Sequence, residues 1–288
     1  METIVNTLIS GLISGSLYAA MALGLTIIYG VSRVFNFGHG VVALIGAYLT
    51  WMALQSFGVP FLPATLFALA AMFLLGVGIY RLAIKPLLQK PNWEFSTVLF
   101  MLGAGILLEN VLLQLFGPRV KSIPTFLTGR LIIGFVEING HELALIAIVI
   151  IFIILLSLFF KYTRLGQAMR AVAQSIPGAR VVGIDIDRIF SYTFGLAFLV
   201  TGFSGILLGT KYYLNPHIGW EWMVKGFVIT TFGGLGSTTG AIYAAIILGV
   251  VEALATLYLG AIWVWPIWFG MFMIILLLRP QGLLGGRL

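Results

Sequence analysis

The chain has 288 residues, of which 60% are hydrophobic and only 9% are charged, and its mean hydropathy is +1.10. Because a soluble domain carries about 25% charged residues, this chain could not cover a surface that faces water. The lack of cysteine excludes disulfides, thiolate catalysis and cysteine metal ligands, and the net charge of +7 does not by itself indicate nucleic acid. We therefore expect a lipid-embedded, all-α integral membrane protein, a polytopic helical bundle that forms one transmembrane domain over residues 1–288.

About eight stretches are long and apolar enough to cross a bilayer, since a spanning helix needs about 20 mostly apolar residues. They lie near 7–30, 40–57, 61–80, 95–116, 143–160, 189–210, 241–258 and 260–278. A further apolar piece at 223–233 is short for a crossing and ends at the glycine-rich run 233–240. We expect a broken or re-entrant helix there, with a plain loop between two spans as the alternative.

The basic residues lie mostly in segments that alternate to one side of these spans. Of the 16 lysines and arginines, most belong to this group: Arg33, Arg81, Lys85, Lys90, Lys161, Arg164, Arg170, Arg180, Arg188, Arg279 and Arg287. The other side receives Arg119, Lys121, Arg130, Lys211 and Lys225. The positive-inside rule places the larger group in the cytoplasm. We therefore expect the N-terminus outside and the C-terminus inside a bacterial inner membrane.

The expected outer loop spans residues 117–142. It contains a strand-like run from Leu131 to Ile138, followed by Asn139-Gly140, a dipeptide typical of hairpin turns. We expect either a small hairpin or a plain solvated loop, on which a delivery protein could dock.

The expected inner loop spans residues 161–188 and is the most informative segment outside the lipid. Apolar residues from Arg164 to Ile176 follow helical spacing and form one stripe, Pro177 interrupts the helix, and Ala179 to Ile184 forms a second piece. A helix lying on anionic lipid would explain this pattern. The stripe consists mostly of Ala, Val and Met, which favours a helix that fits the groove of a soluble partner.

Polar residues within the spans are candidates for a translocation pathway, because ionisable groups in a membrane face the bundle interior or water. The candidates are Asn36, His39, Glu109 and Glu252, together with the glycine-rich break at Gly233, Gly234, Gly236 and Ser237. A structural role is the alternative for each: a satisfied histidine, or an interhelical hydrogen bond of a glutamate. The breaks Gly38-His39-Gly40 and Gly236 to Gly240 each lead into a span, which suggests a duplicated unit.

Enzyme signatures are lacking in the sequence. The run at 233–240 has no phosphate-binding lysine, no nucleophile elbow occurs, and the three histidines show no metal spacing. We expect no catalytic residues, metal or cofactor. Energy for active transport would come from a partner or an ion gradient.

Several motifs, in order along almost the whole chain, resemble those of permease subunits of branched-chain amino acid ABC importers. They are Asn36-Phe37-Gly38-His39-Gly40, Thr163 to Ala171 (TRLGQAMRA), Gly233 to Ala241 (GGLGSTTGA), Glu252-Ala253 and Arg279 to Gly285 (RPQGLLG). Gly38 departs from the family, where alanine is more usual, and Pro177 has no family counterpart that we can assign.

The resemblance implies a role for the inner loop and a set of partners. The loop would dock on a cytoplasmic ATPase, and the residues that carry over to this role are Arg164, Gly166, Ala168, Arg170, Ala171, Ala179 and Gly183. Two ATP-binding subunits, a second homologous permease, a periplasmic binding protein and an amino acid substrate would complete the system.

Two other functions remain open at this level. Related permeases for urea, short amides, sugars or nucleosides share these motifs. An ion-coupled secondary transporter or channel would instead work alone and would need no docking loop.

Overall fold

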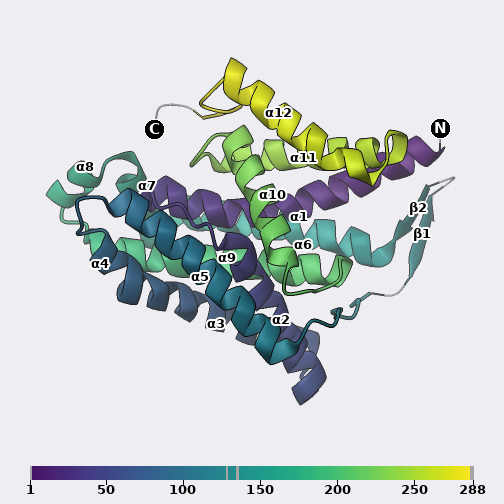
Figure 1. The fold of residues 1–288 in the computed structure, drawn as a ribbon, viewed down its shortest axis with the longest axis horizontal. Coiled ribbons are helices and arrows are strands. Elements are labelled where there is room, and N and C mark those ends of the chain that lie inside the picture. The colour runs from purple at the N-terminus through teal and green to yellow at the C-terminus, as the bar shows by residue number, and fades with distance from the viewer. Residues whose placement is uncertain (1, 128, 134–135, 286–288) are drawn as a thin grey trace.

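A computed structural model describes residues 2–127, 129–133 and 136–285 as a bundle of helices with one small hairpin (Figure 1). The elements before the hairpin are α1 (Glu2–Ser32), α2 (His39–Phe57), α3 (Phe61–Ile79), the π-helical turn η1 (Tyr80–Ile84), α4 (Lys85–Leu87) and α5 (Trp93–Phe116). The hairpin strands β1 (Arg130–Ile133) and β2 (Val136–Asn139) follow. The remaining elements are α6 (Gly140–Tyr162), α7 (Arg164–Gln174), α8 (Ile176–Val181), α9 (Ile186–Lys211), α10 (Ile218–Gly233), α11 (Thr238–Tyr258), the 3-10 turn η2 (Ala261–Trp263) and α12 (Val264–Leu278).

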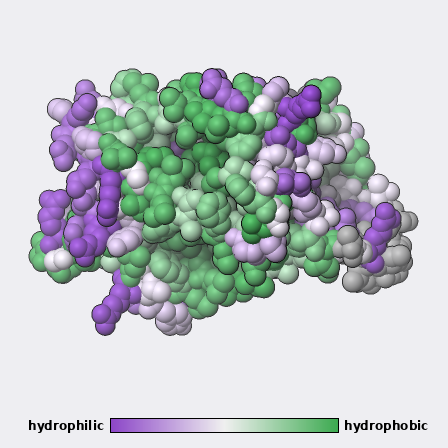
Figure 2. Space-filling view, turned by 90° about the horizontal axis from the view of Figure 1, so that it is seen from below, coloured by the Kyte–Doolittle hydropathy of each residue, from purple (hydrophilic) through white to green (hydrophobic). Residues whose placement is uncertain are grey.

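Among the described residues, 8 helices are long and apolar enough to cross a membrane, which confirms the predicted polytopic all-α bundle. The third of these runs on through η1 to Leu87, further than predicted. Figure 2 shows an apolar belt between two hydrophilic ends of the molecule. We call the end with α4, α7 and α8 the basic end, and the end with β1 and β2 the hairpin end (Figure 1).

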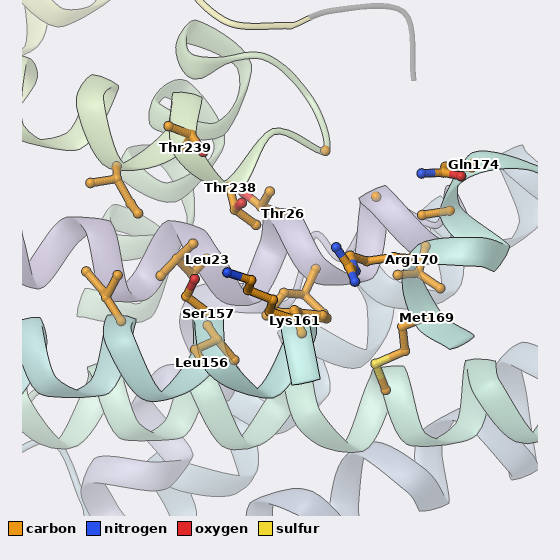
Figure 3. A pocket seen from close by; sticks show the side chains of 18 residues that line it. Leu23, Thr26, Leu156, Ser157, Lys161, Met169, Arg170, Gln174, Thr238 and Thr239 are labelled. Atoms are coloured by element: carbon orange, nitrogen blue, oxygen red, sulfur yellow. The ribbon is translucent and has the colours of Figure 1, made fainter. Parts of the chain in front are cut away.

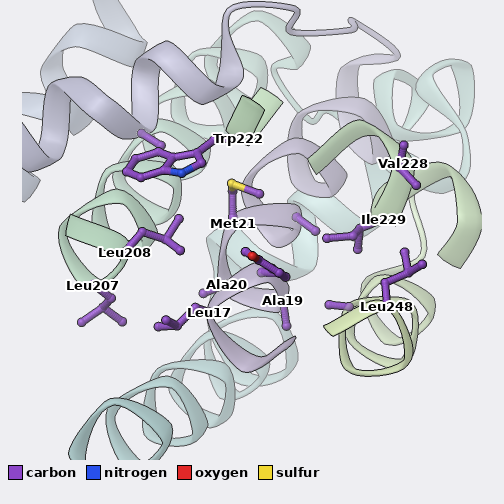
Figure 4. Packing of buried hydrophobic residues seen from close by; sticks show 14 of the residues in the cluster. Leu17, Ala19, Ala20, Met21, Leu207, Leu208, Trp222, Val228, Ile229 and Leu248 are labelled. Carbon is purple, nitrogen blue, oxygen red and sulfur yellow. The ribbon is translucent and has the colours of Figure 1, made fainter. Parts of the chain in front are cut away.

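The centre of the bundle is α1. The most apolar window of α1 is 94% buried and that of α9 is 83% buried, whereas the windows of α6 and α12 are only 17% and 11% buried. Side chains of α1 such as Leu17 and Met21 pack among residues of α9, α10 and α11, including Leu208, Ile229 and Leu248 (Figure 4). The outer helices therefore supply the surface that faces lipid or partner subunits.

Glycines allow α1 and α11 to pack closely in opposite directions. A Cβ added to Gly11 would lie 2.8 Å from Val250 Cα, and one added to Gly15 would lie 2.9 Å from the carbonyl oxygen of Ala245. Small residues at four-residue intervals typically permit such close approach in membranes. Further along the seam, Gly30 lies beside Gly236, so α11 begins at the basic end.

The predicted short, broken element corresponds to α10. At the end of α9, Lys211 Nζ and Tyr212 Oη each lie 3.1 Å from Ser14 Oγ of α1, whereas the turn after α10 lies beside Gly30. With 16 residues, α10 is about 24 Å long, less than the hydrocarbon thickness of about 30 Å. The helix α10 is therefore short, and non-helical segments flank it at both ends. The chain passes from the hairpin end to the basic end through it, so α10 is not re-entrant.

The duplicated unit has a different register from the one expected. In the linker 33–38, the side chain of Asn36 accepts a hydrogen bond from Gly38 N (3.0 Å) before α2 begins. In the linker 212–217, Asn215 accepts one from His217 N (3.0 Å) before α10 begins.

The first residues of α2 and α10 meet, since a Cβ on Gly40 would lie 1.9 Å from Gly219 O. The break before α2 therefore corresponds to the break before α10, and the predicted match with Gly236 to Gly240 is wrong.

The two units are inverted relative to each other. The unit of α1, α2 and α3 starts at the hairpin end, and the unit of α9, α10 and α11 starts at the basic end. Inverted repeats are a common plan in transporters. Only a few identical residues, such as the paired asparagines and glycines, mark this repeat in the sequence.

A hairpin is present in the expected outer loop, but Asn139-Gly140 does not form its turn. The strands pair antiparallel, with Arg130 opposite Asn139 and Ile133 opposite Val136, and residues 134–135 between them lie outside the described residues. The side chain of Asn139 instead accepts a hydrogen bond from His141 N (3.1 Å) and caps α6. Asparagine suits a helix N-cap as well as a turn, so the dipeptide alone did not distinguish the two.

Candidate functional site

The predicted coupling element consists of two short helices, α7 and α8, at the basic end (Figure 1). Thr163 Oγ1 accepts a hydrogen bond from Gly166 N (3.0 Å) and caps α7, and Ser175 Oγ accepts one from Gly178 N (3.1 Å) and caps α8. Pro177 lies in the first turn of α8, where a missing N–H costs nothing. The element is therefore a pair of capped helices, as predicted, but the second helix starts at Ile176 and includes Pro177, whereas the sequence analysis placed it from Ala179 to Ile184.

The apolar stripe of α7 packs against the bundle itself, so the expectation that it enters the groove of a partner is wrong. Met169 and Val172 are buried in a core cluster with residues of α1 and α9. Gly166 is buried so tightly that an added Cβ would lie 2.3 Å from Phe159 O. Small side chains allow α7 to lie close to α6, which explains their presence without a partner.

The predicted coupling residues thus fall into two groups. Gly166 and Ala179 are buried and Ala168 and Ala171 are half-buried, whereas Gly183 is exposed and adopts a φ of +84° in the turn before α9. Arg164 and Arg170 are exposed. The most exposed apolar side chains of the element are Val181 and Val182, at 88% and 73%, and the sequence analysis did not single them out.

The glycine-rich break after α10 holds the C-terminal segment. Leu283 N donates to Phe232 O (2.8 Å), and Leu284 N donates to Gly233 O (3.0 Å). These bonds satisfy carbonyl groups at the end of α10 that have no partner within the helix. A Cβ on Gly234, which has a φ of +109°, would lie 2.4 Å from Gly285 N. Two motifs far apart in the sequence, 233–240 and 279–285, therefore form one structural unit.

The other candidates in this break have local roles. Ser237 Oγ accepts a hydrogen bond from Gly240 N (3.1 Å) and caps α11. Gly236, with a φ of +85°, forms the turn beside Gly30 of α1.

Replacing Gly282 by alanine is expected to loosen this unit. Gly282 has a φ of +78°, and an added Cβ would lie 2.5 Å from Gly234 N. The control is Gly260→Ala, because Gly260 has a φ of +90° but no neighbour within 4 Å. The control measures the cost of the backbone conformation alone, about 1–2 kcal/mol. Gly282→Ala should lower the melting temperature of the purified chain well below that of the control. Equal melting temperatures would show that the contact contributes nothing.

His39 and Asn36 make contacts that hold local structure. The His39 ring is fully buried, with Nε2 at 2.8 Å from Met21 O and Nδ1 at 3.3 Å from Thr201 Oγ1. Both ring nitrogens are therefore engaged between α1 and α9. Asn36 uses its side-chain oxygen to cap the turn at Gly38. These contacts hold the start of α2 at the depth of Met21, within the bundle.

Glu109 joins α5 to the start of α10. Its Oε1 lies 2.5 Å from His217 Nδ1, and its Oε2 accepts a hydrogen bond from Trp220 Nε1. The residue is only 8% exposed. These contacts match the structural alternative considered for this glutamate, an interhelical hydrogen bond, with partners that the sequence did not identify.

Glu252 belongs to a charged cluster around Lys225, which the charge count had grouped with the outer side of the membrane. The Lys225 side chain is only 7% exposed. Its Nζ lies 3.0 Å from Glu252 Oε1, 2.8 Å from Tyr18 Oη and 3.3 Å from Glu221 Oε1. It also lies over the ring of Trp268 at 5.6 Å. The cluster links α1, α10, α11 and α12. The spacing of Glu221 and Lys225, four residues apart on a helix, was the available signal.

A cavity of about 480 Å³ opens at the basic end between α1, α6, α7 and the start of α11 (Figure 3). Among the predicted residues, Gly236 and Arg170 line it, whereas Asn36, His39, Glu109 and Glu252 do not. The structure therefore does not bring the pathway candidates together. They lie in three separate interhelical contacts and one turn.

Comparisons with known proteins agree along nearly the whole chain. The family model described as "Branched-chain amino acid transport system / permease component" matches residues 7–278. The high-affinity branched-chain amino acid transport system permease protein BraD of Pseudomonas aeruginosa is 32% identical, and the match covers 96% of this chain and 94% of BraD. The corresponding protein LivH of Salmonella typhimurium is 30% identical, with the same coverage of both chains. LivM of Escherichia coli, a permease protein of the same type of system, is 27% identical over 93% of this chain and 68% of LivM.

The family match begins in α1 and ends with α12, and two relatives at 30% identity or more are covered almost completely. The matched region includes the helical bundle, the α7–α8 element and the glycine-rich break described above. This multi-pass membrane chain therefore belongs to the permease components of branched-chain amino acid transport systems.

Proposed function

We propose that the chain is the permease subunit of an ATP-driven importer that carries leucine, isoleucine and valine. The observation that carries this proposal is the similarity to BraD and LivH over nearly the whole chain. The partners would be two cytoplasmic ATP-binding subunits, a second homologous permease and a periplasmic binding protein. The similarity to LivM supports a second permease related to this chain. ATP would be hydrolysed by the partner subunits and not by this chain.

The proposed orientation places the basic end in the cytoplasm and the hairpin end outside. The hydrophilic groups at the basic end form one cap of the molecule (Figure 2), and an excess of Lys and Arg is typical of the cytoplasmic side. Residues 161–188 would then face the ATPase, and residues 117–142 would face the binding protein. The N-terminus would lie outside and the C-terminus inside.

The proposed mechanism is alternating access driven through α7. Met169 and Val172 of α7 share a core cluster with Leu23 and Ile27 of α1, the most buried helix. A displacement of α7 by the ATPase would therefore move α1 and the helices packed around it. Coupling requires that ATP and solute each bind the inward-facing and outward-facing states with different affinities.

Purification of the complex from its native membrane tests this proposal. We expect an ATPase to copurify, and we expect the associated binding protein to bind leucine, isoleucine and valine in preference to urea or short amides. Preference for urea or amides would replace the substrate and keep the class of transporter. Transport that follows an ion gradient without an ATPase would contradict the proposal.

The exposed end of α8 gives a sharper test of the docking surface. Val181→Glu/Val182→Glu should weaken association with the ATPase by about tenfold or more. If these valines lie in the core of the interface, each new carboxylate would lose its hydration when the ATPase binds. The double variant should melt at the wild-type temperature, since both side chains are exposed. The control is Val120→Glu, which changes a side chain 59% exposed in the expected outer loop. If the double variant binds the ATPase as the control does, α8 is not the docking surface.

A further inference from the structure

The cavity at the basic end combines an apolar wall with a cationic rim. Leu23 and Ile27 of α1, Ile153 and Leu156 of α6, and Ile242 of α11 form the wall. At the rim, Lys161 and Arg170 extend into the cavity from α6 and α7 (Figure 3). The lining is therefore amphipathic, with its apolar part toward the middle of the bundle.

The two rim cations have no acidic partner in the part of the chain that the structure describes. Lys161 Nζ lies over the ring of Tyr162 at 5.0 Å, and no carboxylate lies within salt-bridge distance of it or of Arg170. The other polar side chains of the lining include the hydroxyl groups of Ser157, Thr238 and Thr239, whereas the Thr26 hydroxyl already donates to Ala22 O. Two cations surrounded by hydrogen-bond donors favour an anion.

Among the residues that the structure describes, no aspartate or glutamate lines the cavity. A zwitterionic amino acid bound here would leave its ammonium group without a partner, which is costly in a partly desolvated site. The lining therefore suits a ligand that carries negative charge alone and an apolar tail, and it does not suit the proposed solute.

The position of the cavity favours a lipid over a soluble anion. The apolar window of α6 is only 17% buried, so most of this helix lies on the outside of the chain, where lipid can reach it. Along α1, the lining extends from Leu23 to Val31, about 12 Å of helix, which is long enough to lie beside the upper part of an acyl chain. Basic pockets between spanning helices at the cytoplasmic side typically bind acidic head groups.

We propose that this cavity binds an anionic glycerophospholipid from the adjoining leaflet, with its phosphate between Lys161 and Arg170 and an acyl chain along α1 and α6. The bound lipid bridges α7 to the two spans α1 and α6. It would therefore stabilise one position of α7 relative to the bundle.

Native mass spectrometry of the full chain tests this proposal, with phosphatidylglycerol and phosphatidylcholine of the same acyl chains as probes. The variants are Lys161→Gln, Arg170→Gln and the double variant. One control, Lys161→Arg, keeps the charge; the other, Lys90→Gln, removes a cation at the same end but outside the cavity. Each glutamine variant should weaken phosphatidylglycerol binding by roughly fivefold, and the double variant by roughly thirtyfold. Both controls should bind like the wild type.

Equal retention of phosphatidylglycerol by the double variant and by Lys90→Gln would overturn the proposal, as would equal affinity for phosphatidylcholine. Displacement by inorganic phosphate at millimolar concentration would assign the site to a soluble anion. Displacement by leucine would assign it to the solute pathway. The double variant should keep the wild-type melting temperature in detergent without phosphatidylglycerol, which separates lost binding from misfolding.

Discussion

Replacing Gly40 by alanine is expected to destabilise the fold by about 3 kcal/mol. The added Cβ would lie 1.9 Å from Gly219 O and 2.4 Å from Met223 N. Both neighbours are backbone atoms of α10, which cannot rotate away as the end of a side chain can. The helices α2 and α10 would have to separate at the point where the two inverted units meet.

The melting temperature of the purified chain measures this effect. We expect Gly40→Ala to melt roughly 6–12 °C lower than the wild type, if it can be purified at all. The matched control is Gly78→Ala in α3, where an added Cβ would have no neighbour within 4 Å. Alanine is the better helix former by about 1 kcal/mol, so the control should melt at or above the wild-type temperature. A Gly40→Ala variant as stable as this control would contradict the close contact of α2 and α10.

Removing the charge of Lys225 is expected to destabilise the fold strongly. In Lys225→Met, Glu252 would lose the cation at 3.0 Å and remain in the bundle without a counter-charge. Breaking a buried ion pair on one side typically costs about 3–5 kcal/mol. We therefore expect little folded protein in the membrane, measured as the monodisperse fraction after solubilisation.

The double variant Lys225→Met/Glu252→Gln separates charge from packing. It removes the pair together, and such replacements are often close to neutral for stability. We expect the folded fraction to recover. A double variant that folds and transports would assign the pair to structure, whereas one that folds and does not transport would assign it to the pathway. If Lys225→Met alone folds like the wild type, the pair is not buried as described.

The spans and the α7–α8 element could be predicted from the sequence because each has a strong local signal. Long apolar runs determine the spans, and the spacing around Met169 and Val172, with Pro177 after it, determines the two short helices. The surface against which the apolar stripe of α7 packs could not be predicted in the same way. An apolar face shows that a helix packs on something, but the same pattern fits a partner's groove and the helix's own bundle.

The contacts that were missed are long-range or run against a local rule. Gly234 and Gly282 meet although 47 residues separate them, and nothing local to either glycine indicates the other. Lys225 was counted with the outer side of the membrane because a charge usually marks the end of a span. In the structure it lies within the bundle, where Glu252 and Glu221 balance its charge and Tyr18 lies within hydrogen-bond distance. The repeat was placed in the wrong register because glycine-rich breaks are frequent, while the informative pair was Asn36 and Asn215.

The central claim is that this chain provides a passive pathway and receives its work from an ATPase docked at the basic end. Uptake of radiolabelled leucine into proteoliposomes, with the ATPase subunits, second permease and binding protein added or omitted, tests it most directly. We predict uptake only when all components and ATP are present, and its loss in Val181→Glu/Val182→Glu. Concentrative uptake by this chain alone, or full uptake with the α8 variant, would contradict the claim.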